Sequence, residues 1–168
     1  MRSALSCVLV ASVASALAFP LALSAQDEMA QLERSCDAGE KYACERLAVR
    51  VWSLSIRYLL GSDGVPKDSA RADSLRSLTL SLYERGCELG AQRSCVELTE
   101  MRNLLPQERV IWAMQRACDL REGAMCLRLG LMYDLGFQGV PKDTARASEL
   151  FKKGCLFDNK EACNLIRR

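Results

Sequence analysis

The stretch GVPKDSARA at residues 64–72 returns almost unchanged as GVPKDTARA at residues 139–147. In both copies a glycine and a proline, which favour a turn, precede an aspartate that can cap a following helix. Internal repetition of this kind is the sequence signature of repeat architectures. The two copies therefore predict that the chain is built from similar units stacked one after another.

The cysteines define the boundaries of these units. Apart from Cys7, they form four pairs, each with a spacing of eight residues: Cys36/Cys44, Cys87/Cys95, Cys118/Cys126 and Cys155/Cys163. An even number of cysteines at one fixed spacing is typical of a disulfide framework in an oxidising compartment. Metal binding is the alternative interpretation, but zinc sites favour two to four intervening residues. The spacing therefore predicts one disulfide within each pair.

A disulfide across eight residues requires the chain to turn. On one continuous helix the two cysteines would lie about 12 Å apart, which is beyond the reach of a disulfide. We therefore expect the first cysteine to end one helix, a Gly or Asn region to break it, and the second cysteine to lie in the opening turns of an antiparallel helix. Closing each short loop stabilises the fold by roughly 2–3 kcal/mol.

Between the corners, the segment from Cys118 to Cys155 predicts a helical hairpin whose turn contains Gly136 and Gly139. The equivalent segment from Cys44 to Cys87 carries seven extra residues in each helix, which is about two helical turns. The segment from Cys95 to Cys118 is shorter, and its turn, NLLPQER, lacks glycine. Residues 27–36 and the final ACNLIRR are interpreted as half units. We expect an all-α solenoid of about three full repeats with a half repeat at each end.

The motifs C-x-x-L-G-x-M-Y, G-x-x-G-V-x-K-D and A-x-x-L-F-x-K-G-C, read from Cys126 to Cys155, resemble the Sel-like repeat in its secreted, cysteine-rich bacterial form. This family is related to the tetratricopeptide repeat. The resemblance implies a curved α-solenoid whose concave face binds partners, with disulfides that staple the repeats. It also implies a link to penicillin binding or weak β-lactam hydrolysis, which is described for some cysteine-rich relatives.

The first 25 residues are interpreted as a signal peptide: one arginine, an apolar run, Pro20 and small residues before the first acidic ones. Residues 26–168 would then form a single domain that is secreted or periplasmic, without stable membrane insertion. A retained N-terminal membrane anchor is the alternative. The 23 basic and 21 acidic residues nearly balance, which argues against nucleic acid as a partner.

The catalytic alternatives lack the residues that they need. The chain has no histidine, and no lysine follows a serine at the spacing of the S-x-x-K motif of serine β-lactamases. Thiol–disulfide exchange is disfavoured because the cysteines do not form a C-x-x-C motif. We therefore predict a non-catalytic module, without a cofactor, that binds a protein segment or an envelope component. A weak β-lactam-binding or β-lactam-hydrolysing enzyme is the alternative function.

Six residues are candidates for partner binding. Five arginines are expected on the first helices of the repeats, where they can bind carboxylates or an anionic glycan. Trp52 can stack against a ligand or dock on a partner. The alternatives are an i to i+4 ion-pair network for the arginines and packing in the core for the tryptophan. The five arginines are Arg46, Arg50, Arg57, Arg102 and Arg128.

Other apolar residues are expected to be structural. Trp112 can fill the short hairpin, while Tyr58 and Tyr133 occupy equivalent positions in two repeats and are interpreted as packing residues. Four residues follow a corner cysteine by three positions and are predicted to lie in the core: Leu47, Leu98, Leu129 and Ile166.

Overall fold

The computed structural model describes the backbone of residues 20–137 and 139–166, and side chains from residue 27 onward. These residues form eight α-helices and one short 3₁₀ helix, and they contain no strand. In chain order the helices are α1 (Pro20–Asp37), α2 (Lys41–Leu60), α3 (Ser69–Glu88), α4 (Gln92–Glu100), η1 (Arg102–Leu104), α5 (Gln107–Asp119), α6 (Gly123–Leu135), α7 (Thr144–Leu156) and α8 (Lys160–Ile166).

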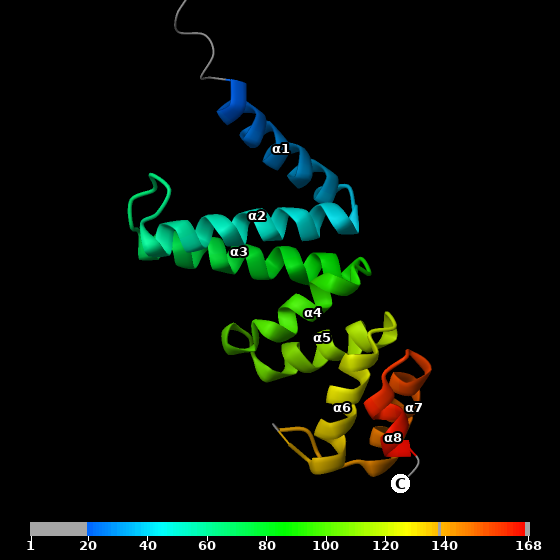
Figure 1. Ribbon diagram of the computed structural model, residues 1–168. Coiled ribbons are helices and arrows are strands. Elements are labelled where there is room, and N and C mark those ends of the chain that lie inside the picture. Colours follow the sequence, from blue (N-terminus) through cyan, green and yellow to red (C-terminus); the bar gives the residue numbers. More distant parts are fainter. Residues whose placement is uncertain (1–19, 138, 167–168) are drawn as a thin grey trace, which may run out of the picture.

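The helices stack as a solenoid. Each α-helix packs against the next one in the chain, and contacts also join α3 to α5 and α6 to α8. Figure 1 shows the hairpins α2/α3, α4/α5 and α6/α7 layered below α1. We refer to α2, α4, α6 and α8 as first helices, and to α1, α3, α5 and α7 as second helices. The prediction of three full repeats flanked by half repeats is confirmed.

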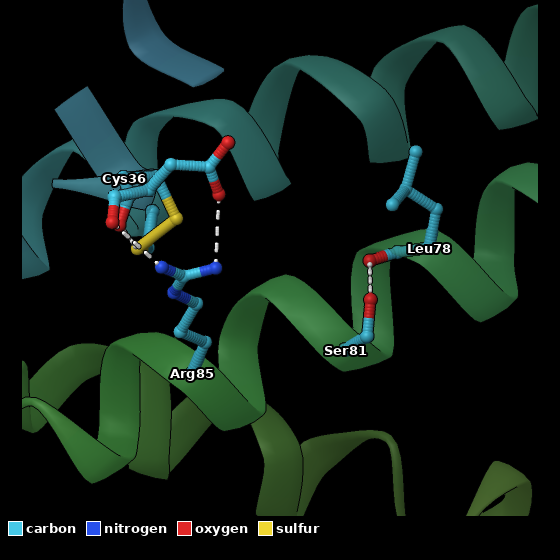
Figure 2. The surroundings of a disulfide bond; sticks show 6 residues. Cys36, Leu78, Ser81 and Arg85 are labelled. Atoms are coloured by element: carbon cyan, nitrogen blue, oxygen red, sulfur yellow. Dashed lines mark hydrogen bonds and ion pairs between the residues drawn. A yellow bond between two sulfur atoms is a disulfide. The ribbon is translucent and has the colours of Figure 1, made fainter. Parts of the chain in front are cut away.

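All four predicted disulfides are present and lie at the corners between repeats. Figure 2 shows the surroundings of the disulfide of Cys36, at the first corner. They join each second helix to the next first helix, with Cα–Cα distances between 4.5 and 4.7 Å. At every corner the first cysteine is the penultimate residue of its helix, and the second is the fourth residue of the next. The corner geometry predicted from the spacing is therefore confirmed.

The residue that breaks the helix at each corner is three positions after the first cysteine, and its φ is positive. Glycine provides this conformation at Gly39 and Gly90, with φ of 91° and 87°. At the other two corners the same conformation is held by Arg121 and Asp158, with φ of 74° and 63°. The expectation of a Gly or Asn break is therefore wrong at these two corners, because Gly123 already belongs to α6 and Asn159 follows the left-handed residue.

The two nonapeptides form the same turn. Gly61 and Gly136 end α2 and α6 in the left-handed conformation, with φ of 70° and 67°. A Cβ atom at either glycine would lie 3.1 Å from the Cβ of a lysine in the nonapeptide, Lys67 or Lys142. Both the conformation and the close approach therefore favour glycine.

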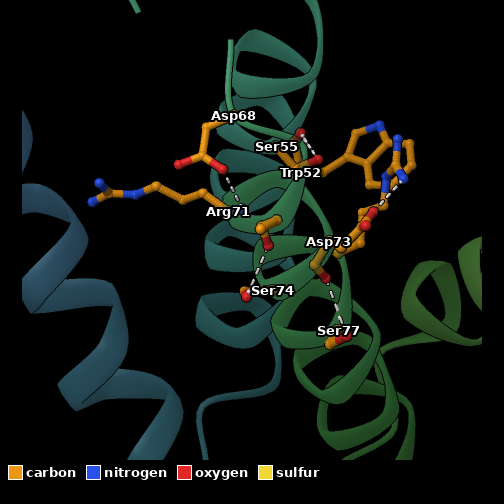
Figure 3. A network of polar contacts seen from close by, with 9 residues as sticks. Trp52, Ser55, Asp68, Arg71, Asp73, Ser74 and Ser77 are labelled. Carbon is orange, nitrogen blue, oxygen red and sulfur yellow. Dashed lines mark hydrogen bonds and ion pairs between the residues drawn. The ribbon is translucent and has the colours of Figure 1, made fainter. Parts of the chain in front are cut away.

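The aspartate that both nonapeptides share caps the second helix of its hairpin. Asp68 accepts a hydrogen bond from the backbone N–H of Arg71 at 2.9 Å (Figure 3), and Asp143 accepts one from the N–H of Arg146 at the same distance. These bonds satisfy one of the N–H groups that lack a partner at the start of a helix. The predicted capping role is confirmed.

The arginine of each nonapeptide stacks on a tyrosine of the preceding helix. The guanidinium carbon lies 4.8 Å from the ring centroid of Tyr58 for Arg71, and 4.5 Å from that of Tyr133 for Arg146. Each tyrosine carbonyl also accepts a backbone hydrogen bond from the capping aspartate at 2.8 Å. The repeated sequence therefore encodes a turn, a cap and a cation–π contact together.

Helix lengths agree with the predicted insertions. The helices α2 and α3 each have 20 residues, whereas α6 and α7 each have 13, a difference of seven in both arms. When the hairpins are aligned both on the corner cysteines and on the turns, the seven extra residues of each arm fall inside α2 and α3. In the short repeat, α4 has only nine residues and is followed by η1 and Pro106.

The core follows the repeat. Counting back from the first cysteine of a corner, the residues at one, four, five and eight positions are buried in all three complete second helices. These residues are Thr79, Leu82, Tyr83 and Gly86; Val110, Ala113, Met114 and Ala117; and Ala147, Leu150, Phe151 and Gly154. Cysteines, small residues, aliphatic side chains and two aromatic rings thus fill the space between first and second helices.

The predicted core residues on the first helices agree with this arrangement at three of four positions. Leu47, Leu98 and Leu129 are at most 6% exposed. Ile166 is 39% exposed, so its assignment to the core is wrong. It lies on α8, a first helix with no following second helix among the described residues to cover it.

The N-terminal half repeat is longer than expected, because α1 begins at Pro20 and not near residue 27. Three of its four core-equivalent positions are polar, Glu28, Gln31 and Ser35, and only Leu32 is buried. A polar outer face is typical of the capping repeat of a solenoid.

The predicted signal peptide falls largely on residues 1–19, which lie outside the described residues. Within the part of the chain that the structure describes, no helix is both long and apolar enough to cross a membrane.

Candidate docking groove

An apolar groove of about 590 Å³ lies between α1, α2 and α3. Two second helices form its walls, and the first helix between them in sequence forms its floor. Its residues are Met29, Ala30, Glu33, Cys36 and Asp37 from α1; Leu47 and Val51 from α2; and Leu78, Ser81, Leu82 and Arg85 from α3. The volume is within the range of about 300–1,000 Å³ that is common for ligand sites.

The groove owes part of its apolar surface to the extended hairpin. Val51 and Leu78 lie in α2 and α3, the two helices that are each seven residues longer than their equivalents α6 and α7. Val51 is 2% exposed, whereas Leu78 is 46% exposed and points from α3 towards α2 (Figure 2). The long helices therefore place alkyl surface at a site that is open to solvent.

An ion pair closes the corner end of the groove. Arg85 donates to the Asp37 carboxylate at 2.9 Å and to the Asp37 carbonyl at 3.0 Å (Figure 2). Beside it, the Ser81 hydroxyl donates to the Leu78 carbonyl at 2.8 Å. Glu33, on the α1 wall, is exposed and has no hydrogen bond or ion pair to any described residue. The groove therefore presents alkyl side chains beside one unpaired carboxylate.

The same corner positions join successive repeats further along the chain. Lys153 pairs with Asp119 at 3.1 Å. These two residues occupy the same positions relative to the corner cysteines of α7 and α5 as Arg85 and Asp37 do on α3 and α1. Between them, Arg116 donates to the carbonyl of Glu88 at 3.3 Å. The Arg85–Asp37 pair is therefore one of three equivalent polar contacts that join successive second helices.

The candidate arginines on α2 pair with acidic residues. Arg46 and Arg50 converge on Glu28 of α1, at 3.6 and 3.1 Å. Arg57 lies 3.3 Å from Asp63 in the following turn. The arginines therefore pair with acidic residues, as the alternative interpretation expected. The partners lie on a neighbouring helix or turn, however, and not four residues away on the same helix.

The remaining two arginines meet at Glu100. Arg128 on α6 lies 3.0 Å from its carboxylate, and Arg102 lies 3.9 Å from it. Arg102 belongs to η1, so its expected place on a first helix is wrong; α4 ends at Glu100, before it. The five arginines therefore do not form one cluster, because two share Glu28, two share Glu100, and Arg57 pairs with Asp63.

The two tryptophans differ in their surroundings. Trp112 is partly buried against the core and lies under the guanidinium of Arg109, 4.7 Å from the ring centroid. Trp52 is partly exposed, and Figure 3 shows its indole on the flank of the hairpin that carries Asp73. At 100° per residue, it lies on the opposite side of α2 from Arg50.

The groove itself was missed in the sequence. An alignment of the repeats on their first corner cysteines could have indicated it, because Ser81, a small residue, occupies the position of the large Trp112. Elsewhere, the described residues contain no group of three His, Cys, Asp or Glu side chains placed to hold a metal ion.

No protein-family model and no curated protein matches the sequence. The fold is similar to the crystal structure of a Sel1 repeat protein from Oxalobacter formigenes, with a TM-score of 0.52 and 23% sequence identity, over 83% of this chain and 97% of that one. A protective antigen from uropathogenic Escherichia coli strains, which displays an SLR fold, aligns with a TM-score of 0.46 and 20% identity. That alignment covers 82% of this chain and 35% of the antigen. The chain therefore has the fold of a Sel1 repeat protein, as its cysteine and glycine motifs predicted.

Proposed function

We propose that the protein is an interaction module that binds a segment of another protein in the groove between α1, α2 and α3. The observation that carries this proposal is an open apolar groove on a disulfide-stapled scaffold, beside a carboxylate, Glu33, that has no partner among the described residues. Solenoids of stacked helical hairpins generally bind protein partners. Burial of apolar surface would supply most of the binding free energy.

The four disulfides indicate an oxidising extracellular or periplasmic environment. We propose that residues 1–25 direct export and that residues 26–168 are the working domain. An exported protein or another envelope component is then the partner class.

The candidate residues outside the groove would contribute at the margins of the complex. Arg46, Arg50 and Arg57 lie on α2 beside α1, and a partner carboxylate would have to compete with their acidic partners. Arg102 and Arg128 face the same competition from Glu100. Trp52 offers exposed aromatic surface on the extended hairpin. We expect single arginine changes to weaken binding by less than about tenfold.

A comparative pull-down from envelope extract tests the proposal. Ser81→Trp fills the groove, and Glu149→Trp adds the same bulk at the equivalent position of α7, six residues before its corner cysteine. A further variant lacks residues 49–55 and 73–79. We expect one partner to be retained by the wild type and by Glu149→Trp, and lost by the filled and trimmed variants. Equal capture by all four proteins would place the binding site elsewhere.

A further inference from the structure

The spaces between successive second helices can be compared position by position. Three positions matter when residues are counted back from the first cysteine of each corner. On α3, α5 and α7, the residues six positions before the corner cysteine are Ser81, Trp112 and Glu149, in that order. The residues nine positions before the same cysteines are Leu78, Arg109 and Arg146. On the second helix that precedes each of these, α1, α3 and α5, the residues three positions before the corner cysteine are Glu33, Glu84 and Gln115. Each set belongs to the α1/α3, α3/α5 and α5/α7 spaces in turn.

Between α3 and α5, the chain fills this space with its own side chains. Trp112 packs against the core, and the Arg109 guanidinium lies over its ring. Arg109 also pairs with Glu84, with its Nη2 at 2.8 Å and its Nε at 3.0 Å from the same carboxylate oxygen. An aromatic ring, a cation and a carboxylate thus form one unit.

Between α1 and α3, two parts of that unit are missing. Ser81 replaces the tryptophan and Leu78 replaces the arginine, while Glu33 retains the carboxylate of Glu84. Glu33 accordingly has no partner among the described residues. The groove beside it is lined by Leu78, which is 46% exposed, and by the partly exposed Met29, together with the buried Leu47 and Val51.

The α5/α7 space is different in character. It is lined by polar side chains that include Gln115 and Glu149. Arg146, which occupies the position of Arg109, stacks on Tyr133. A carboxylate with no partner among the described residues, beside apolar side chains, is therefore a feature of the α1/α3 groove.

We propose that this groove binds a helical partner segment that carries a basic residue three positions before a large aromatic residue, the spacing of Arg109 and Trp112. The aromatic side chain would pack against the accessible alkyl surface of Leu78 and Met29, and the basic side chain would pair with Glu33. The charge and the empty positions of the groove argue for this occupant. The inference rests on the proposed docking function and specifies the chemistry of the docked segment.

Two other occupants fit the groove less well. A second copy of the chain cannot readily present Arg109 and Trp112, because both are engaged between α3 and α5. Residues 1–19 have a single basic residue, Arg2, which is far in sequence from their single aromatic residue, Phe19.

Isothermal titration of the oxidised protein with three synthetic helical peptides tests the inference. The peptides share one sequence and carry Arg-x-x-Trp, Glu-x-x-Trp or Arg-x-x-Ala. We expect Arg-x-x-Trp to bind most tightly, at least about threefold more tightly than Glu-x-x-Trp. Glu33→Lys should reverse that preference, which a loss of folding could not do. Ser81→Trp should abolish binding, and Glu149→Trp should leave it unchanged.

Three outcomes would overturn the inference. Equal affinity for the Arg and Glu peptides, or a preference unchanged in Glu33→Lys, would remove the role of Glu33. Peptide binding unaffected by Ser81→Trp would place it outside the groove. A concentration-dependent dimer in light scattering that Ser81→Trp dissociates would assign the groove to a second copy. If a protein partner still depends on Ser81 in the pull-down while the peptides show no charge preference, docking stands and the basic–aromatic motif is wrong.

Discussion

Arg121 holds a conformation that glycine provides at equivalent corners. Its φ is 74°, in the left-handed region that is costly for residues with a Cβ atom. We expect Arg121→Gly to raise the free energy of unfolding by about 0.5–1 kcal/mol, because the relief of strain exceeds the added flexibility of the unfolded chain. Chemical denaturation measures the change.

Arg121→Ala is the matched control. The guanidinium of Arg121 lies 5.5 Å from the ring centroid of Phe157, and both substitutions remove this contact. Alanine keeps the strain, so it should not stabilise the protein. A glycine variant no more stable than the alanine variant would show that the left-handed conformation carries little strain.

Tyr83 links stability to alkaline pH. Burial, together with the charge of Glu97, raises the pKa of Tyr83 from 10.0 to about 12. The folded protein therefore holds the phenol proton more tightly than the unfolded chain does. This contribution is complete below pH 10 and is lost as the pH rises towards 12.

We expect the wild type to lose on the order of 2 kcal/mol across this pH range through Tyr83, and Tyr83→Phe to lack that loss. The measurement is the free energy of unfolding at a series of pH values, by rapid denaturation before disulfides exchange. Parallel pH curves for the two proteins would contradict the assigned pKa.

At the residue scale, the sequence predicted features with a strict covalent or steric requirement. The cysteine pairs, Gly136, Gly139 and both aspartate caps have the expected roles. The conformation of Arg121 could not be predicted, because no side chain chemistry requires it. The chain is forced into it by the corner that the disulfide closes.

At the scale of single elements, the repeated nonapeptide makes a quantitative prediction. Asp68→Ala and Asp143→Ala should each lower the free energy of unfolding by about 1 kcal/mol, because each removes a cap. The two effects should add, since the caps lie in different hairpins. Asp73→Ala is a control, because its ion pair with Arg76 is exposed on the carboxylate side and should contribute less than about 0.5 kcal/mol.

Thermal and chemical denaturation of the single and double variants would measure these effects. A loss from Asp73→Ala as large as that from Asp68→Ala would contradict the special role of the caps.

Helix lengths were predictable because an insertion between two aligned anchors leaves few choices. Seven residues in each arm keep the corners and the turn in register, and both long helices have the expected length. The groove was not predictable from any single helix. It depends on the packing of α1 and α3 against α2. It also depends on Ser81 and Leu78, which occupy the positions where the next repeat has larger side chains, Trp112 and Arg109.

At the scale of the whole molecule, the four disulfides differ in exposure. The six cysteines of the first three corners are at most 1% exposed. Cys155 and Cys163 are partly exposed, because the array has no further described helix to cover α8. Attack by a thiolate on a disulfide requires access to sulfur.

We therefore expect mild reductant to open Cys155–Cys163 first. Alkylation followed by mass spectrometry would then label these two cysteines while the other three pairs remain protected. Earlier labelling at any of the other three corners would contradict the packing of that corner. The same exposure explains why Ile166, predicted as core from its position in the repeat, is not buried.

The central claim is that the groove between α1, α2 and α3 docks a partner protein. Site-specific photocrosslinking in the source cells tests it most directly, with the photoreactive residue at position 81 and, as control, at position 149. The account predicts a discrete protein adduct at position 81, whose formation in envelope preparations is suppressed by an Arg-x-x-Trp peptide added before irradiation, and no such adduct at position 149. No adduct at position 81, or the same adducts at both positions, would contradict it.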